Sequence, residues 1–240
     1  MKQGYEACGG SLDFTDEQYY YLLSLLERYE YDITMHRVVI REHTDPAWPT
    51  KISFDEWGVW HPEANLDNNQ NQRQSVRDAI FAALTLHIFY RNADIVEFAM
   101  ETQLSNLLQS LFETDGPRFY KTPTFYVMKL LKGHIGQRLL PLLPDDVDDR
   151  LDAVATVSED GSRITVSLVN TDLHETKTVR LQLPQGDWRV EKADVLTAAD
   201  VHDCNSFDDP LRVCDAPFAV AAAGPVTLPP HSLVRICYKN

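Results

Sequence analysis

The sequence predicts an α/β part over residues 1–138, followed by an all-β domain over residues 139–240. Apolar residues recur with the 3.6-residue period of helices in the first part and with the two-residue period of strands in the second. Between the two parts, both periods are interrupted by Pro141, Pro144, Asp145, Asp146, Asp148 and Asp149. We place the domain boundary at this interruption.

The first part alternates helices with short strands. A helix is expected to begin at Thr15, because Gln18 three residues later completes a capping box. Its apolar face consists of Tyr19, Leu22, Leu23, Leu26 and Tyr29. Further helices are predicted over 33–42, 75–92 and 123–133, and the last has Thr122 as its N-cap and Pro123 at its first position. A buried strand is predicted over 51–57, and another strand over 95–100.

This alternation favours a parallel sheet with helical crossovers, either a doubly wound sheet or a (β/α)₈ barrel. A complete barrel takes about 250 residues, roughly 30 for each strand and helix. The first part therefore has room for about four such units, and only two strands are found. If it is a barrel, most of it is missing.

The second part offers short alternating strands separated by turn residues. Strands are predicted over 153–156, 163–170, 176–183, 188–195 and 232–238, with turns such as Glu159-Asp160-Gly161 and Pro229-Pro230 between them. Short strands at this spacing are typical of a β-sandwich.

Charge narrows the range of partners. With 36 acidic and 22 basic side chains, the chain has a formal net charge of −14. This charge repels phosphate backbones and anionic membranes, so neither nucleic acid nor membrane is expected as a partner. Neutral sugars are recognised through hydrogen bonds and stacking, so the acidic net charge does not exclude them as ligands. The sequence shows neither a signal peptide nor a membrane span, and we expect a cytoplasmic protein.

Cysteine and histidine spacing indicates neither a metal site nor a cofactor site. The four cysteines, Cys8, Cys204, Cys214 and Cys237, include no C-x-x-C pair and are expected to be free buried thiols. A disulfide between Cys204 and Cys214 is the alternative if the chain is secreted. The histidines of the first part are expected to be structural or solvated; they are His36, His43, His61 and His87.

The richest candidate site is Phe54-Asp55-Glu56-Trp57-Gly58-Val59-Trp60, at the end of the strand predicted over 51–57. Parallel α/β folds build active sites at the carboxyl ends of their strands. Glycosidases use carboxylates there, together with aromatic faces that stack on sugars. Because side chains alternate along a strand, Asp55 and Glu56 should point in opposite directions, so only one of them is expected to attack.

The segment ISFDEWGVW resembles the strand-seven motif of family 51 α-L-arabinofuranosidases. The runs RDAIFAALTLHIFYRNADIVEFAMETQLSNLLQSLF, TPTFYVMKLLKGH and LTAADVHDCNSFDDP are similar to the same family in the same order, over nearly all of residues 4–240. The resemblance implies the last two strands of a (β/α)₈ barrel with their helices, followed by a C-terminal β-sandwich. It also implies a retaining enzyme that removes terminal arabinofuranosyl residues from arabinan- or arabinoxylan-type glycans.

Carried onto this sequence, the resemblance makes Glu56 the nucleophile. Trp60 becomes a substrate-stacking residue, and Gln103 a hydrogen-bonding partner of sugar hydroxyls. Asp55 and Trp57 take supporting roles behind them. The implied partner is an arabinose-containing oligo- or polysaccharide, the parent enzyme is implied to be a homo-oligomer, and neither cofactor nor metal is expected.

The general acid/base is the missing element of this assignment. In the family it is a glutamate that follows an asparagine on strand four, and no carboxylate before Glu56 has that setting. We therefore expect a C-terminal fragment that is inactive alone. Two other interpretations stay open: a non-catalytic fragment that binds carbohydrate or a partner protein, and a relative of the endoglucanase type.

Overall fold

The computed structural model describes residues 7–101, 103–143, 148–221 and 224–240. Its helices are α2 (Asp16–Ser24), α3 (Glu27–His43), α4 (Val76–Arg91) and α5 (Pro123–Leu131), with the short 3-10 helices η1 (Leu66–Asn68) and η2 (Lys132–His134). Its strands in the first part are β1 (Ile52–Trp57), β2 (Val96–Glu101), β3 (Phe112–Asp115) and β4 (Arg118–Lys121). Those that follow are β5 (Arg138–Leu140), β6 (Leu151–Val157), β7 (Arg163–Asn170), β8 (Lys177–Val179), β9 (Arg189–Leu196), β10 (Asp215–Pro217), β11 (Val226–Leu228) and β12 (Ser232–Lys239).

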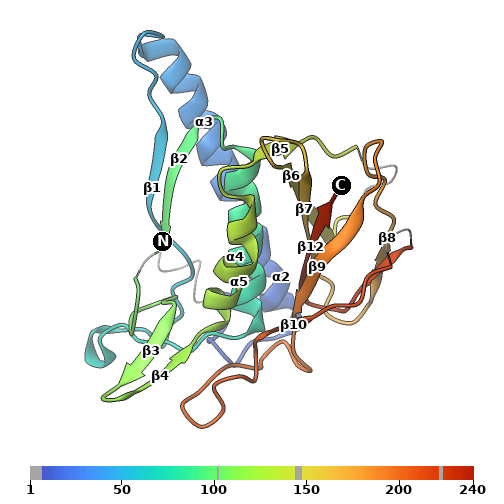
Figure 1. Cartoon of the computed structure of the whole chain (residues 1–240). Helices are drawn as coiled ribbons and strands as arrows, with labels where there is room; N and C mark the ends of the chain where they lie inside the picture. Colours follow the sequence, from blue (N-terminus) through green and yellow to red (C-terminus); the bar gives the residue numbers. More distant parts are fainter. Residues whose placement is uncertain (1–6, 102, 144–147, 222–223) are drawn as a thin grey trace.

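Helices α4 and α5 form the middle layer of the molecule. Figure 1 shows them between the parallel pair β1–β2 on one side and a large antiparallel sheet on the other. That sheet has six strands in the order β10-β9-β12-β7-β6-β5. The predicted combination of an α/β part with an all-β part is thus what the chain forms.

The first predicted helix is divided in two. The capping box at Thr15 and Gln18 is present and starts α2. A turn at Leu25 and Leu26 then ends α2 and begins α3, which runs to His43 and contains the predicted helix over 33–42. Tyr19, Leu22 and Leu26 are buried as expected, and Leu23 and Tyr29 are half-buried against the same core. The apolar face therefore continues across the break.

The prediction of a buried strand over 51–57 is wrong about burial. Within β1 only Trp57 is buried, and the other residues are half-buried or exposed. One side of the strand packs on α4, where the rings of Phe54 and Phe89 lie 4.6 Å apart. Among the described residues β1 pairs only with β2, so no strand covers its other edge.

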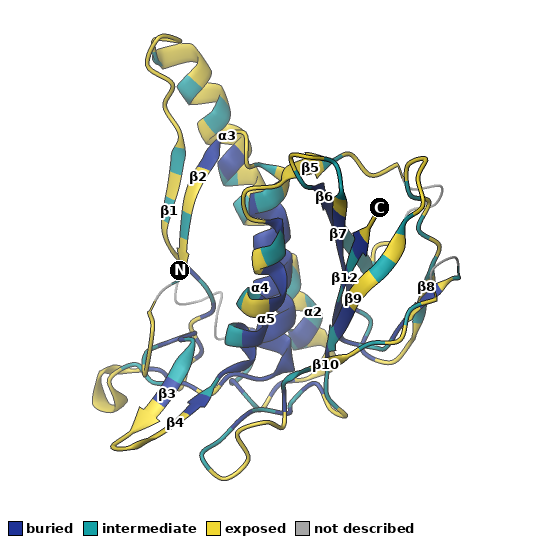
Figure 2. Ribbon diagram, in the orientation of Figure 1, coloured by how far each residue is buried: buried dark blue, intermediate teal, exposed yellow. Residues whose placement is uncertain are grey.

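Helix α4 is the centre of the core. Ser75 and Asp78 form its capping box, and every residue from Val76 to Phe89 is buried. The sequence predicted a single apolar stripe, but Figure 2 shows α4 dark along nearly its whole length. Burial on all sides follows from its place in the middle layer, where it contacts α2, α3, α5 and the six-stranded sheet.

The hairpin β3–β4 was missing from the sequence prediction, which found only β1 and β2 in the first part. Its turn contains Gly116, whose φ of +56° suits glycine. Helix α5 follows directly, and the Thr122 side chain caps it by accepting a hydrogen bond from the Phe125 N–H. The predicted start of the helix over 123–133 is confirmed.

The sandwich packs the six-stranded sheet against the pair β8–β11. Ile164, Val166 and Leu168 of β7 alternate toward this second core, where they meet Val226 and Leu228 of β11. The other face of the six-stranded sheet meets the helices, and Val169 and Leu233 join the first core there. The strand predicted over 176–183 is shorter than expected, since β8 covers only Lys177–Val179. The three-residue strands β5, β10 and β11 were not predicted.

The apolar period changes from helical to strand-like near residue 139, and the chain enters a different sheet at the same place. Strand β5 begins at Arg138 and pairs with β6, so it already belongs to the large sheet. We propose that the two parts meet at residue 138. Of the residues that interrupt the pattern, Pro144, Asp145 and Asp146 lie outside the described residues.

Cys204 and Cys214 are free thiols, so the alternative of a disulfide between them does not hold. Only Cys8 is buried, and the other three thiols are half-buried, contrary to the expectation that all would be buried. In the part of the chain that the structure describes, no helix has both the length and the apolar character needed to cross a membrane.

Candidate active site

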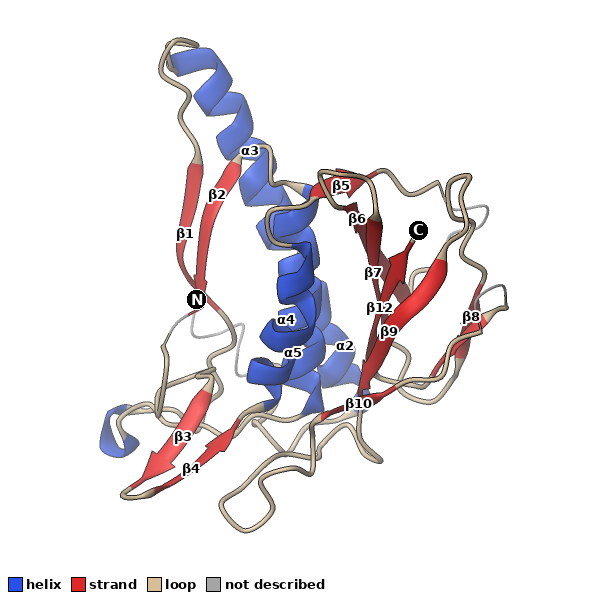
Figure 3. Ribbon diagram, viewed as in Figure 1, coloured by secondary structure: helices blue, strands red, loops and turns tan. Residues whose placement is uncertain are grey.

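The carboxyl ends of β1 and β2 bring the predicted site residues to one end of the parallel pair. Glu56 is the penultimate residue of β1, and Trp57 pairs with Glu101 at the end of β2. Trp60 lies three residues beyond β1, and Gln103 lies two residues beyond β2. Figure 3 shows both strands running toward this end, near the β3–β4 hairpin.

The two adjacent carboxylates differ in their surroundings. Asp55 accepts a hydrogen bond from the Ser53 hydroxyl at 2.8 Å. The Glu56 carboxylate has no hydrogen-bond or ion-pair partner among the described residues, and Glu56 is exposed. The register of β1 shifts between Phe54 and Trp57. Asp55 and Glu56 are both exposed, and the expectation that their side chains point in opposite directions stays a prediction.

The two tryptophans have separate places. Trp57 is 2% exposed and packs edge-on against Phe89 of α4, so it lies in the core behind the strand end. Trp60 is 38% exposed, and its indole N–H donates to the carbonyl of Ala64 at 2.8 Å. An aromatic ring held at its edge and open to solvent is suited to stacking on a sugar.

Buried glutamines that the sequence analysis overlooked hold the segment after β1. The Val59 N–H donates to Oε1 of Gln109 at 2.7 Å. Gln72 donates to the Val59 carbonyl and accepts from the His61 N–H, both at 2.8 Å. The amide-rich run that precedes α4, NNQNQRQ over 68–74, was the available signal.

His61 fixes the far side of the same loop. Its Nε2 lies 2.7 Å from Asp78 Oδ1, and its Nδ1 lies 3.3 Å from a guanidinium nitrogen of Arg77. Burial alone raises the pKa of Asp78, but His61 and Arg77 outweigh that effect and hold the pKa below its ordinary value. His61 is therefore structural, as predicted, and it connects the loop to the first turn of α4.

A second polar cluster resembles a serine-histidine-aspartate arrangement. His87 Nδ1 contacts Asp152, and His87 Nε2 lies 2.7 Å from the Ser167 hydroxyl. That hydroxyl is also 2.9 Å from Nε2 of His134. Ser167 and His87 are both 0% exposed, so no substrate reaches the hydroxyl. The cluster joins α4 to the six-stranded sheet and is structural, as expected for His87.

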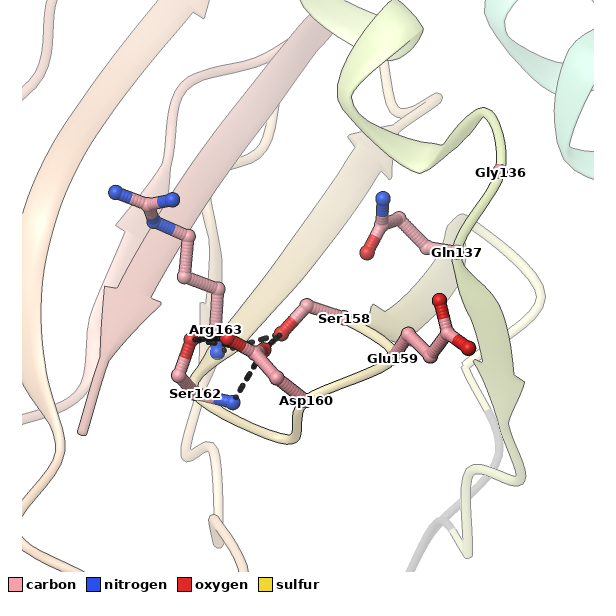
Figure 4. A pocket seen from close by; sticks show the side chains of 7 residues that line it. All are labelled: Gly136, Gln137, Ser158, Glu159, Asp160, Ser162 and Arg163. Atoms are coloured by element: carbon pink, nitrogen blue, oxygen red, sulfur yellow. Dashed lines mark hydrogen bonds between the residues drawn. The ribbon is translucent and has the colours of Figure 1, made fainter.

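Two surface hollows lie away from Glu56. The first, of about 460 Å³, is on the edge of the sandwich and is lined by Gly136, Gln137, Ser158, Glu159, Asp160, Ser162 and Arg163 (Figure 4). Asp160 there serves its own turn by accepting hydrogen bonds from Ser158 and Ser162. The second hollow involves Lys51 and Ile95, just before β1 and β2, at the opposite end of the strands. Neither hollow is lined by Glu56, Trp60 or Gln103, so the strand ends stay the candidate sugar site.

The described residues include no group of three or more histidine, cysteine or carboxylate side chains that could hold a metal ion. His36 and His43 are exposed on α3. The chemistry available at the strand ends is that of an exposed carboxylate, Glu56, and an exposed aromatic ring, Trp60, four residues further along the chain.

Comparison with known sequences gives a consistent set of relatives. A sequence profile of the family described as the α-L-arabinofuranosidase C-terminal domain matches residues 55–232. An intracellular exo-α-L-arabinofuranosidase of Bacteroides ovatus is 30% identical, over 95% of this chain and 47% of its own length. An exo-α-(1→6)-L-arabinofuranosidase of Bifidobacterium longum is 28% identical, over 78% of this chain and 42% of its own length. The chain spans about half the length of the curated relatives it matches.

Solved structures agree on the fold. The family 51 arabinofuranosidase from Xanthomonas axonopodis pv. citri matches with a TM-score of 0.84 at 28% identity, over 96% of this chain and 49% of the other. An α-L-arabinofuranosidase from Thermotoga maritima, in complex with arabinose, gives a TM-score of 0.78 at 23% identity, over 92% and 50% of the two chains. The expected fold, the end of a barrel followed by a sandwich, is confirmed.

Proposed function

Because this chain belongs to the α-L-arabinofuranosidase C-terminal domain family and corresponds to the C-terminal portion of a family 51 enzyme, we propose that it carries the nucleophile of a retaining exo-α-L-arabinofuranosidase. The observation that carries the proposal is the exposure and position of the Glu56 carboxylate. It is an exposed carboxylate without a partner among the described residues, at the carboxyl end of a parallel strand. Active sites of this architecture lie at that end.

In the proposed reaction the Glu56 carboxylate attacks the anomeric carbon of a terminal arabinofuranosyl residue. The bond to the leaving oxygen breaks, and a glycosyl-enzyme ester forms. A second carboxyl group protonates the leaving oxygen and then, as a base, activates the water that hydrolyses the ester. No described residue donates a hydrogen bond to the Glu56 carboxylate. This supports its role, because a carboxylate stabilised by donors is a weaker nucleophile.

Trp60 and Gln103 are proposed to bind the sugar. The exposed Trp60 ring offers an apolar face, and the exposed Gln103 amide offers both a donor and an acceptor for hydroxyl groups. The substrate class follows from the names of the relatives, which remove α-L-arabinofuranosyl residues. We also propose that the protein acts inside the cell, as the names of the relatives from Bacteroides ovatus and Acetivibrio thermocellus state for those enzymes.

The second carboxyl group is proposed to come from the remainder of the barrel, in a longer chain or in a partner chain. Uncovered apolar surface in the first part supports this arrangement. Val38 and Val39 on α3, and Phe98 and Met100 on β2, are 44%, 50%, 62% and 46% exposed. Figure 2 shows this side of the molecule mostly in the colours of exposed and half-buried residues. Further barrel strands and helices would cover such a surface.

The proposal is tested by complementation. The purified chain is assayed on an aryl α-L-arabinofuranoside, alone and together with the separately produced N-terminal half of the Bacteroides ovatus relative. We expect turnover only in the mixture, and a loss of about 10⁴-fold or more with Glu56→Ala. Glu97→Gln, at an exposed carboxylate within β2, is the matched control and should keep its activity.

Azide distinguishes a nucleophile from a structural carboxylate. In the complemented Glu56→Ala protein, azide can enter the space left by the side chain and attack the anomeric carbon. The expected product is an arabinosyl azide of inverted configuration, identified by NMR. If the Glu56→Ala mixture keeps the wild-type rate, the assignment of Glu56 is wrong.

A further inference from the structure

We propose that Gln72 and Gln109 are positioning residues for the sugar site. They fix the backbone on both sides of Trp60 and so set the orientation of its ring. The benefit to sugar binding rests on the proposed function, because it requires that Trp60 stacks on the sugar. The positioning itself rests on hydrogen bonds between buried groups.

Among the described residues, the segment after β1 pairs with no strand, yet it is buried at Val59. Strand β2 ends at Glu101, opposite Trp57, and no pairing with a described residue continues the ladder to Val59. Val59 is nevertheless only 2% exposed. Its N–H and carbonyl groups therefore need partners inside the protein, because a buried backbone group without one is costly.

Side-chain amides take the place of the missing strand. Gln109 accepts from the Val59 N–H, and Gln72 donates to the Val59 carbonyl. Gln72 also accepts from the His61 N–H, so one amide bridges the residues before and after Trp60. This pattern copies the paired donor and acceptor of a neighbouring strand. With both neighbours fixed, Trp60 has little backbone freedom left.

Both glutamines are themselves firmly held. Gln109 is 0% exposed, and its Nε2 donates to the Asp78 carbonyl and to the Thr124 hydroxyl, each at 3.0 Å. Gln72 is 3% exposed. Burying an amide is unfavourable unless it is hydrogen-bonded, and an apolar side chain would fill the same space without that cost. Their amides are explained by the loop geometry that they impose.

The chain supplies its own matched control in Gln74. It is also 3% exposed and makes two hydrogen bonds, from its Nε2 to the Ser110 carbonyl and from the Thr124 hydroxyl to its Oε1. Neither bond involves the Gly58–His61 segment. Gln74→Met thus removes an equally buried amide that bonds neither Val59 nor His61. Its one link to their support is the Thr124 hydroxyl, which also accepts from Gln109.

The first experiment uses the 240-residue chain labelled with 5-fluorotryptophan. Trp60→Phe identifies the Trp60 signal among the four tryptophan signals in the fluorine NMR spectrum. We expect Gln72→Met and Gln109→Met to shift or broaden the Trp60 signal and to leave that of Trp188 in place. Gln74→Met should leave both unchanged. If Gln72→Met leaves the Trp60 signal where it is in the wild type, the positioning role is refuted.

A second variant covers the case in which Gln72→Met does not fold. Gln72→Glu has the same shape and keeps the acceptor for the His61 N–H, but when ionised it loses the donor to the Val59 carbonyl. We expect a smaller displacement of the Trp60 signal than with methionine, and its reversal when acid protonates the new carboxyl group. An unchanged signal in this variant also counts against the inference.

A sugar titration separates the positioning role from the proposed function. In the wild-type chain, an arabino-oligosaccharide should move the Trp60 signal with saturation. The sugar concentration at half-saturation should rise about tenfold in Gln72→Met, because a loop that is less well ordered before binding costs about as much free energy as one lost hydrogen bond. It should stay unchanged in Gln74→Met. If the sugar never moves the wild-type signal, the stacking role of Trp60 fails, whereas the fluorine shifts of the sugar-free variants still decide the positioning role.

Discussion

At the scale of single residues, neighbouring groups decide what a carboxylate can do. Glu56 is open to solvent, whereas Asp78 is completely buried among donors. Asp78 Oδ2 accepts from the Ser75 N–H at 2.7 Å, and Asp78 Oδ1 faces His61. The same functional group is available for chemistry at Glu56 and serves only to hold structure at Asp78.

We predict that Asp78→Asn lowers the free energy of unfolding by about 3 kcal/mol, because the new amide N–H₂ must face one of these two donors. The lowered pKa of Asp78 stabilises the fold at pH values above the ordinary aspartate value of 3.8, and this contribution is lost as the pH falls. Urea unfolding at pH 7 and at pH 3.5 should therefore show a smaller difference between variant and wild type in acid. A difference that stays constant would contradict the prediction.

At the scale of elements, helix starts are set locally and strand burial is not. Thr15 and Thr122 were both identified as N-caps from sequence, since capping depends on neighbours three residues away. Their surroundings differ, however. Thr15 is exposed, whereas the Thr122 hydroxyl is buried and donates to the Ser110 carbonyl at 2.7 Å.

We predict that Thr15→Ala costs about 1 kcal/mol and Thr122→Ala about 2 kcal/mol, because the second change also removes a buried hydrogen bond to the loop before β3. Serine at either position should restore most of the loss, since it keeps the hydroxyl group. Thermal unfolding of the four variants measures the difference. Equal losses at the two sites would show that the Ser110 contact contributes nothing.

At the scale of the whole molecule, a buried polar chain joins the helices to the sandwich. Thr156 and Ser167 of the six-stranded sheet bond the two nitrogens of His134, each at 2.9 Å, and Ser167 continues the chain to His87 on α4. Burial, with smaller effects from His87 and Arg235, lowers the pKa of His134 from 6.5 to about 3. His134 therefore stays neutral in the folded protein at pH values where the unfolded chain takes up a proton.

This difference predicts how stability depends on pH. Below pH 6.5 the unfolded state binds one more proton at residue 134 than the folded state, so acid destabilises the fold by about 1.4 kcal/mol for each pH unit. His134→Gln should be less stable than wild type at pH 7.5 by about 1–2 kcal/mol, through lost hydrogen bonds. That gap should narrow by pH 5.5 in urea titrations. His43→Gln, at an exposed histidine, is the control, and a gap that does not narrow would exclude the mechanism.

What the sequence determined by itself is what depends on near neighbours. The capping residues, the extent of α4, the long strands β7 and β12, and the position of Glu56 at a strand end all follow from periods and caps a few residues long. The overlooked hairpin β3–β4 belongs with these, because Asp115-Gly116 is a recognised turn signal. The three-residue strands are too short to show a period.

Only the tertiary structure decided which groups lie together across long stretches of chain. Burial of α4 on every side depends on the β1–β2 pair, whose strands precede and follow it in sequence, and on the six-stranded sheet, which lies entirely after it. The partners of Val59 are Gln72 and Gln109, which are 13 and 50 residues away. Side-chain amides that replace a strand leave no periodic trace, because any loop residue of the right reach can serve. The sequence located the carboxylate, and the fold revealed how the loop beside it is held.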